Sequence, residues 1–155
     1  MSKKSVLIAD DSEKLLSALR EELQVHGYDV RTCTDAYTVL ESAQKQRPDV
    51  MMLDIRMPAG NGFSVLERMR KTPELQNIPV IYITGEKSAE VDLKAEQLGA
   101  RGVIHKPIVL SKLLKLIEAA IGDNDQNASE LSEGSELKEF DLSSDAEAPD
   151  FLRAP

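Results

Sequence analysis

Five side chains in this sequence have the strongest potential for chemistry, because each lies at the end of a short apolar segment. They are the carboxylates of Asp10, Asp11 and Asp54, the hydroxyl of Thr84 and the ammonium group of Lys106. Carboxylates that lie close together repel one another unless a cation or a proton sits between them. Oxygen ligands without Cys or His suit Mg²⁺ better than zinc or copper. The residue types therefore predict a magnesium site suited to phosphate chemistry.

The other two groups extend that chemistry. The Lys106 ammonium group can pair with Asp54 when the site is empty and with a phosphoryl oxygen when it is filled. The Thr84 hydroxyl can bind another phosphoryl oxygen. A carboxylate beside a metal ion and an ammonium group can attack phosphorus and form an acyl phosphate.

Short apolar runs alternate with segments of helical periodicity five times along the chain. The expected strands cover residues 6–9, 29–33, 50–53, 80–83 and 103–105, and the expected helices cover 15–23, 36–46, 63–69, 89–98 and 110–121. We expect Ser12 or Asp11 to cap the first helix and Gly122 to end the last. This alternation predicts an α/β fold with a parallel sheet covered on both faces. The carboxyl ends of its strands bring the five side chains to one edge, where such sheets bind ligands.

A set of short motifs in this order and spacing resembles the receiver domain of two-component response regulators. The motifs are Asp10-Asp11, Asp54 with Met57-Pro58 and Gly62, Thr84-Gly85, and Lys106-Pro107, and the match covers residues 4–122. The resemblance implies a flavodoxin-like, doubly wound fold. Its five-stranded parallel sheet has the order 2-1-3-4-5 and is flanked by five helices. Residues 1–122 would form this domain.

The resemblance also implies roles for the acidic residues. Asp54 would be the phosphoacceptor, taking a phosphoryl group from a phosphohistidine on a sensor histidine kinase or a histidine phosphotransfer protein. Asp11 would bind Mg²⁺ directly, Asp10 mainly through water, and Arg56 through its backbone carbonyl, with Asp54 completing the metal site. The protein would be a self-phosphorylating and self-dephosphorylating switch rather than an enzyme that turns over an external substrate.

Switching depends on the residues around the phosphoryl group. By the same resemblance Lys106 would contact that group, next to a cis Lys106-Pro107 bond, and Thr84 would move toward it. The output surface for a downstream protein would be formed by helix 4, strand 5 and helix 5. Receivers usually carry Tyr or Phe three residues before the lysine, but this chain has Val103. We therefore expect the phosphorylation chemistry to be retained while its coupling to the output differs. Tyr82, on the Thr84 side of its strand, is a candidate for the missing bulk.

Other functions fit the sequence less well. A flavodoxin-like electron carrier must hold a phosphate in its first loop, where Asp10 and Asp11 would repel an anion. A hydrolase of the haloacid dehalogenase type needs a second acid two residues after the nucleophile, and here Arg56 occupies that position. Two alternatives stay open. One is a pseudo-receiver that binds partners without phosphorylation, and the other is the N-terminal part of a longer regulator.

The charge distribution excludes further classes of function. The net charge is −8, and residues 123–155 carry all of it, whereas residues 1–122 are neutral. With no basic stripe, direct binding to nucleic acid or to an anionic membrane is not expected. A single cysteine, Cys33, requires no oxidising compartment, and no apolar run resembles a signal peptide or a membrane span. We expect a cytoplasmic protein that is a monomer or a phosphorylation-dependent dimer.

Residues 123–155 differ in composition from the rest of the chain. They are rich in Asp, Glu, Ser and Ala, which is typical of a disordered tail or linker. Apolar residues in these acidic surroundings allow a second interpretation, in which the tail docks on a partner or folds as a short helix. These residues are Leu137, Phe140 and the Phe151-Leu152 pair.

Overall fold

The computed structural model describes residues 3–58 and 60–124. Five parallel strands form its main sheet, in the order β2-β1-β3-β6-β7. They are β1 (Ser5–Ala9), β2 (Asp29–Cys33), β3 (Val50–Asp54), β6 (Val80–Thr84) and β7 (Gly102–His105). Counted along the chain without the short hairpin strands β4 and β5, the order is 2-1-3-4-5, and the predicted topology is confirmed.

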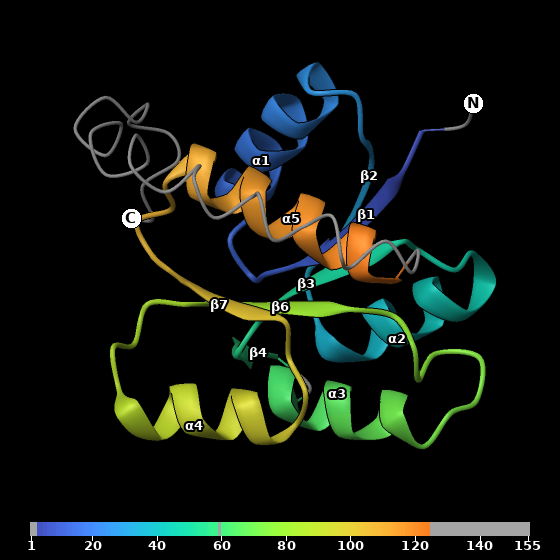
Figure 1. Ribbon diagram of the computed structural model, residues 1–155, viewed down its shortest axis with the longest axis vertical. Helices are drawn as coiled ribbons and strands as arrows, with labels where there is room; N and C mark the ends of the chain where they lie inside the picture. The colour runs from blue at the N-terminus through green and yellow to red at the C-terminus, as the bar shows by residue number, and fades with distance from the viewer. Residues whose placement is uncertain (1–2, 59, 125–155) are drawn as a thin grey trace.

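Five helices cover the two faces of this sheet. They are α1 (Glu13–Val25), α2 (Ala36–Lys45), α3 (Gly62–Arg70), α4 (Ala89–Gln97) and α5 (Leu110–Asn124). Helices α1 and α5 lie on one face, and α2, α3 and α4 lie on the other (Figure 1). Each of the first four helices starts at a residue whose side-chain oxygen accepts hydrogen bonds from backbone N–H groups of the first turn. These N-cap residues are Ser12, Asp35, Asn61 and Ser88. Ser12 rather than Asp11 therefore caps α1.

Alternation along the strands divides the apolar side chains between two cores. In β1, Val6 and Ile8 belong to the core beneath α1 and α5, whereas Leu7 and Ala9 belong to the core beneath α2, α3 and α4. All four side chains are fully buried. This is expected for a parallel strand covered on both faces, and it explains the continuous apolar runs in the sequence.

Two local predictions are corrected by the structure. Helix α5 continues through Gly122 to Asn124, so the prediction that Gly122 ends it is wrong. A glycine inside a helix costs only about 1 kcal/mol relative to alanine, which the packing of an amphipathic helix can offset. The segment expected to be a loop after Asp54 contains a small antiparallel hairpin, formed by β4 (Arg56–Met57) and β5 (Gly60–Asn61).

The chain from residue 125 onward, which includes most of the predicted acidic tail, lies outside the described residues. Among the helices that the structure describes, none combines the length and the apolar character needed to cross a membrane.

Candidate functional site

Three carboxylates meet at the carboxyl-terminal edge of the sheet. Asp10 follows β1, Asp11 begins the next loop and Asp54 ends β3. Each can place one carboxylate oxygen within 4.8 Å of the others. Asp10 is fully buried and Asp54 is 5% exposed, whereas Asp11 is exposed. The predicted convergence of these three residues is therefore observed.

Asp10 is held by the start of the first loop, and one of its oxygens accepts no hydrogen bond from the described residues but faces an ammonium group. Its Oδ1 accepts a hydrogen bond from the backbone N–H of Ser12 at 2.8 Å. Its Oδ2 is buried and accepts no hydrogen bond in the described part of the chain. The Lys106 Nζ lies 3.1 Å from this oxygen as an ion-pair partner. A buried carboxylate oxygen with spare lone pairs is suited to a cation, because leaving it unpaired is costly.

Lys106 extends from the end of β7 into the same cluster. Its Nζ is 3.8 Å from Asp54 Oδ2, which is farther than its distance to Asp10. Lys106 therefore pairs with both buried carboxylates, and Asp10 rather than Asp54 is its nearer partner. The Lys106-Pro107 peptide bond is cis, as predicted.

The surroundings of Asp54 favour its protonated form. Burial, followed by the negative charge of Asp10, raises the pKa of the Asp54 carboxyl to about 6. Lys106 and a 3.3 Å hydrogen bond from the Arg56 backbone N–H oppose that rise in pKa. A cation placed among the carboxylates would offset the repulsion and lower the pKa of the Asp54 carboxyl.

Thr84 ends β6 and is almost fully buried. Its Oγ1 accepts a hydrogen bond from the Glu86 backbone N–H at 2.9 Å. The side chain of Glu86 pairs with Arg56, whose Nη2 lies 2.6 Å from Glu86 Oε2. This ion pair links the loop after Asp54 to the loop after Thr84. The sequence does not reveal this contact, which depends on the packing of two loops 30 residues apart.

Tyr82 supports the connection between Asp54 and α3. Its buried hydroxyl donates a hydrogen bond to the carbonyl oxygen of Gly62 at 2.9 Å. Its ring meets that of Phe63 edge-on, with 5.1 Å between centroids. The suggestion that Tyr82 replaces the missing aromatic at Val103 stays a prediction. This hydrogen bond was not expected from the sequence.

Two histidines and Cys33 lie outside the carboxylate cluster. His105 Nε2 is 3.5 Å from Asp92 Oδ1 on α4, whereas the neighbouring Lys106 points into the cluster. His26 caps the C-terminus of α1, and its Nδ1 lies 2.9 Å from the carbonyl oxygen of Glu22. Cys33 is partly buried, and burial raises the pKa of its thiol. None of the three takes part in the carboxylate cluster of the described structure.

Comparison with known proteins matches this arrangement to one family. The sequence model of the response regulator receiver domain matches residues 6–118. The chain is similar to the polar-differentiation response regulator DivK of Brucella anthropi, with 29% identity over 120 residues that cover 77% of this chain and 98% of DivK. It is 31% identical over 128 residues to the transcriptional regulatory protein PrrA of Mycobacterium tuberculosis. That match covers 83% of this chain but only 54% of PrrA.

Among solved structures, the fold is similar to that of the chemotaxis response regulator CheY4 of Vibrio cholerae. The TM-score is 0.72 at 32% identity, and the alignment covers 77% of this chain and 99% of CheY4. The family match extends over most of the chain, and the sheet order, the acidic cluster and Lys106 agree with it. The chain therefore belongs to the response regulator receiver domain family of two-component signalling.

Proposed function

We propose that the protein is a phosphorylation switch in which Asp54 accepts a phosphoryl group from a phosphohistidine. One observation carries this proposal. A buried oxygen without a hydrogen bond among the described residues, Asp10 Oδ2, lies in the same cluster as the Asp54 carboxylate, and the Lys106 ammonium group lies near both. The two carboxylates supply the negative charge that a metal ion needs, and the Lys106 ammonium group supplies positive charge for a phosphoryl group at the same site.

In the proposed transfer, an Asp54 carboxylate oxygen attacks phosphorus and a P–O bond forms while the P–N bond of the phosphohistidine breaks. The imidazole leaves with the electron pair of that bond and takes up a proton, and Asp54 becomes an acyl phosphate. Lys106 Nζ stabilises charge on one phosphoryl oxygen. Thr84 donates its hydroxyl hydrogen to another, since in its present hydrogen bond with the Glu86 backbone N–H the Thr84 oxygen is only the acceptor.

The donor set fits Mg²⁺, because all three side chains offer carboxylate oxygens and one buried oxygen has no hydrogen-bond partner in the described structure. Asp10, Asp11 and Asp54 would hold the ion together with the backbone carbonyl of Arg56. When bound, Mg²⁺ would neutralise charge on the transferring phosphoryl oxygens. The site requires no further cofactor.

The proposed partners are a sensor histidine kinase or a histidine phosphotransfer protein upstream, and an output protein downstream. The output surface would be formed by α4, β7 and α5, in a cytoplasmic protein without activity on an external substrate. Receiver domains in general partner with kinases and outputs of these kinds, which supports the assignment.

Incubation with acetyl phosphate and Mg²⁺, followed by intact mass measurement, tests the proposal. We expect one added phosphoryl group in the wild type, and none when EDTA is present or in Asp54→Asn. A matched control, Asp49→Asn, alters the acid that directly precedes β3, at the end of the strand away from Asp54, and should label normally. Labelling that persists in Asp54→Asn would refute the acceptor. No labelling of the wild type would instead favour a pseudo-receiver.

A further inference from the structure

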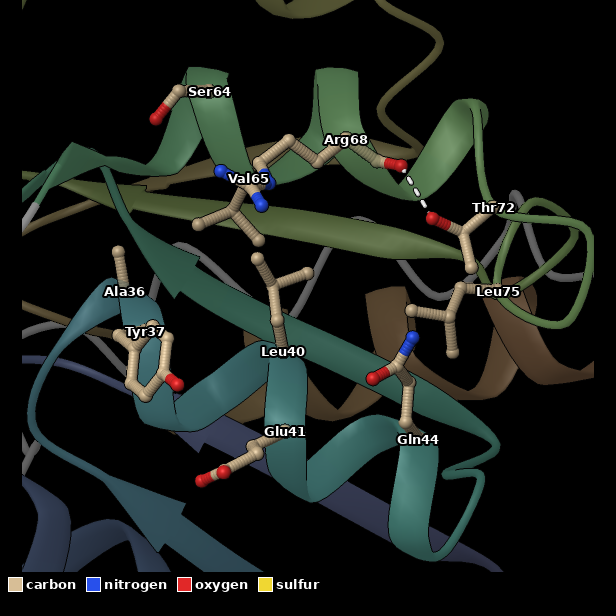
Figure 2. Close-up of a pocket in the computed structure, with 10 residues that line it drawn as sticks. All are labelled: Ala36, Tyr37, Leu40, Glu41, Gln44, Ser64, Val65, Arg68, Thr72 and Leu75. Carbon is tan, nitrogen blue, oxygen red and sulfur yellow. Dashed lines mark hydrogen bonds between the residues drawn. The ribbon is translucent and has the colours of Figure 1, made fainter.

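A groove between α2 and α3 lies apart from the carboxylate cluster, and the proposed phosphotransfer does not use it. It has a volume of about 420 Å³, which is within the usual range for a binding site. Its floor is apolar and contains Leu40, Val65 and Leu75, whose side chains point toward one another (Figure 2). At its rim, Tyr37 is 68% exposed, the most of any aromatic side chain that the structure describes.

Opposite charges stand on the two walls of this groove. Glu41 lies on α2 and Arg68 on α3, and both side chains are exposed. Neither side chain has an ion pair or a hydrogen bond among the described residues. The hydrogen bond drawn in Figure 2 joins the Thr72 hydroxyl to the backbone carbonyl of Arg68 and leaves the guanidinium available. An occupant should therefore have an apolar face with an acid on the side that meets Arg68.

The acidic C-terminal segment of this chain contains a stretch with an apolar pair beside an acid, Glu136–Leu142. In a helix, Leu137 and Phe140 would share one face because they are three positions apart. Glu136 would flank that face on one side, and Asp141 followed by Lys138 would flank it on the other, since each residue turns the helix by about 100°. Glu136 is therefore the residue of this stretch that suits Arg68.

The connecting chain is long enough for this stretch to reach the groove. Helix α5 ends at Asn124, so 16 residue steps separate it from Phe140. An extended chain of that length spans up to about 50 Å, and a domain of this size has a diameter of roughly 35 Å. Covalent connection over that length would also give the stretch an effective concentration in the millimolar range at the groove.

We propose that Glu136–Leu142 binds in the α2–α3 groove of its own chain. Leu137 and Phe140 pack against Tyr37 and Leu40, the apolar side chains of the groove that remain accessible, and Glu136 pairs with Arg68. The interaction is independent of phosphoryl transfer to Asp54 and would occur in the unphosphorylated protein.

Hydrogen exchange of the full chain, measured by mass spectrometry, tests the proposal without perturbing the folded domain. If the effective concentration is about two to ten times the dissociation constant of the stretch from the groove, local opening of α2 and α3 is suppressed about three- to elevenfold. We therefore expect Phe140→Ser to speed exchange in residues 36–45 and 62–75 by about that factor. Phe151→Ser, which removes an aromatic residue elsewhere in the same acidic segment, should leave the exchange unchanged.

Charge reversal gives a second, independent arm. Arg68→Glu should speed exchange of the α2 segment, and adding Glu136→Arg should slow it again by restoring an opposite-charge pair. Equal exchange in wild type and Phe140→Ser would overturn the proposal, as would failure of the double variant to recover. Protection that rises with protein concentration would overturn binding within one chain and would assign the groove to the segment of a second copy.

Discussion

The Asp54 carboxyl group is buried beside two other carboxylates, and its raised pKa should make the stability of the fold depend on pH. Its pKa is raised from 3.8 to about 6, with burial as the largest cause. Because the folded pKa exceeds the unfolded one, the folded state binds the proton more tightly. The contribution to stability is therefore greatest below pH 4 and is lost as the pH rises through 6.

Replacing Asp54 with Asn should remove this pH-dependent loss. In metal-free protein at pH 7.5, we expect Asp54→Asn to raise the free energy of unfolding by about 1–2 kcal/mol, after allowance for solvent screening. The gain should shrink as the pH falls from 6 to 4. Urea unfolding in EDTA at several pH values measures it, and an equal gain at pH 4 and 7.5 would contradict the proposed origin.

Tyr82 provides a second test at a single side chain. Tyr82→Phe removes the hydroxyl that donates to the Gly62 carbonyl oxygen inside the core. We expect a loss of about 1–2 kcal/mol in unfolding free energy, because a buried acceptor is left without its partner. Tyr37→Phe is the control, since Tyr37 is exposed and has no described hydrogen bond. Equal effects of the two changes would show that the bond to Gly62 is not the cause.

The connection between β3 and α3 depends on the absence of a side chain at Gly62. A Cβ there would lie 2.6 Å from the Asp54 carbonyl oxygen and 3.0 Å from Tyr82 Cε1. Helix α3 thus starts in direct contact with the end of the strand that carries the proposed phosphoacceptor.

Gly62→Ala should therefore destabilise the fold by about 1–3 kcal/mol, because backbone must shift to accept the methyl group. Gly85→Ala is a matched control in the loop after Thr84, where an added Cβ would meet nothing within 4 Å. Chemical denaturation of the two variants gives the comparison. A Gly85→Ala loss as large as that of Gly62→Ala would rule out the steric explanation.

A parallel sheet covered on both faces could be predicted because β1, β3 and β6 are short apolar runs buried on both faces, whereas the order of its strands came from the resemblance to receiver domains. The convergence of Asp10, Asp11 and Asp54 followed from the parallel arrangement. Contacts between side chains of separate loops could not be predicted in the same way. The Arg56–Glu86 pair and the closer approach of Lys106 to Asp10 depend on how loops pack after the sheet has formed. The β4–β5 hairpin was missed because its two-residue strands have too few positions to show alternation.

Ligand binding to the acidic cluster should stabilise the entire domain. If Mg²⁺ binds only the folded protein, a free Mg²⁺ concentration of ten times the dissociation constant adds about 1.4 kcal/mol to the free energy of unfolding. Wild type should therefore show a rise in melting temperature with Mg²⁺. Asp11→Ala should not, whereas Glu13→Ala, which alters a nearby acid in the first turn of α1, should respond like wild type. A full response in Asp11→Ala would exclude Asp11 as a ligand.

The most direct measurement of the central claim is chemical trapping of the acyl phosphate. After phosphorylation with Mg²⁺ and acetyl phosphate, borohydride reduces an aspartyl phosphate to homoserine, which peptide mass spectrometry can locate. Asp10 and Asp11 lie in the same cluster as Asp54, so the three acids are internal controls for one another. We expect homoserine at position 54 alone. Homoserine at position 10 or 11, or none in protein shown to carry the phosphoryl group, would contradict the account.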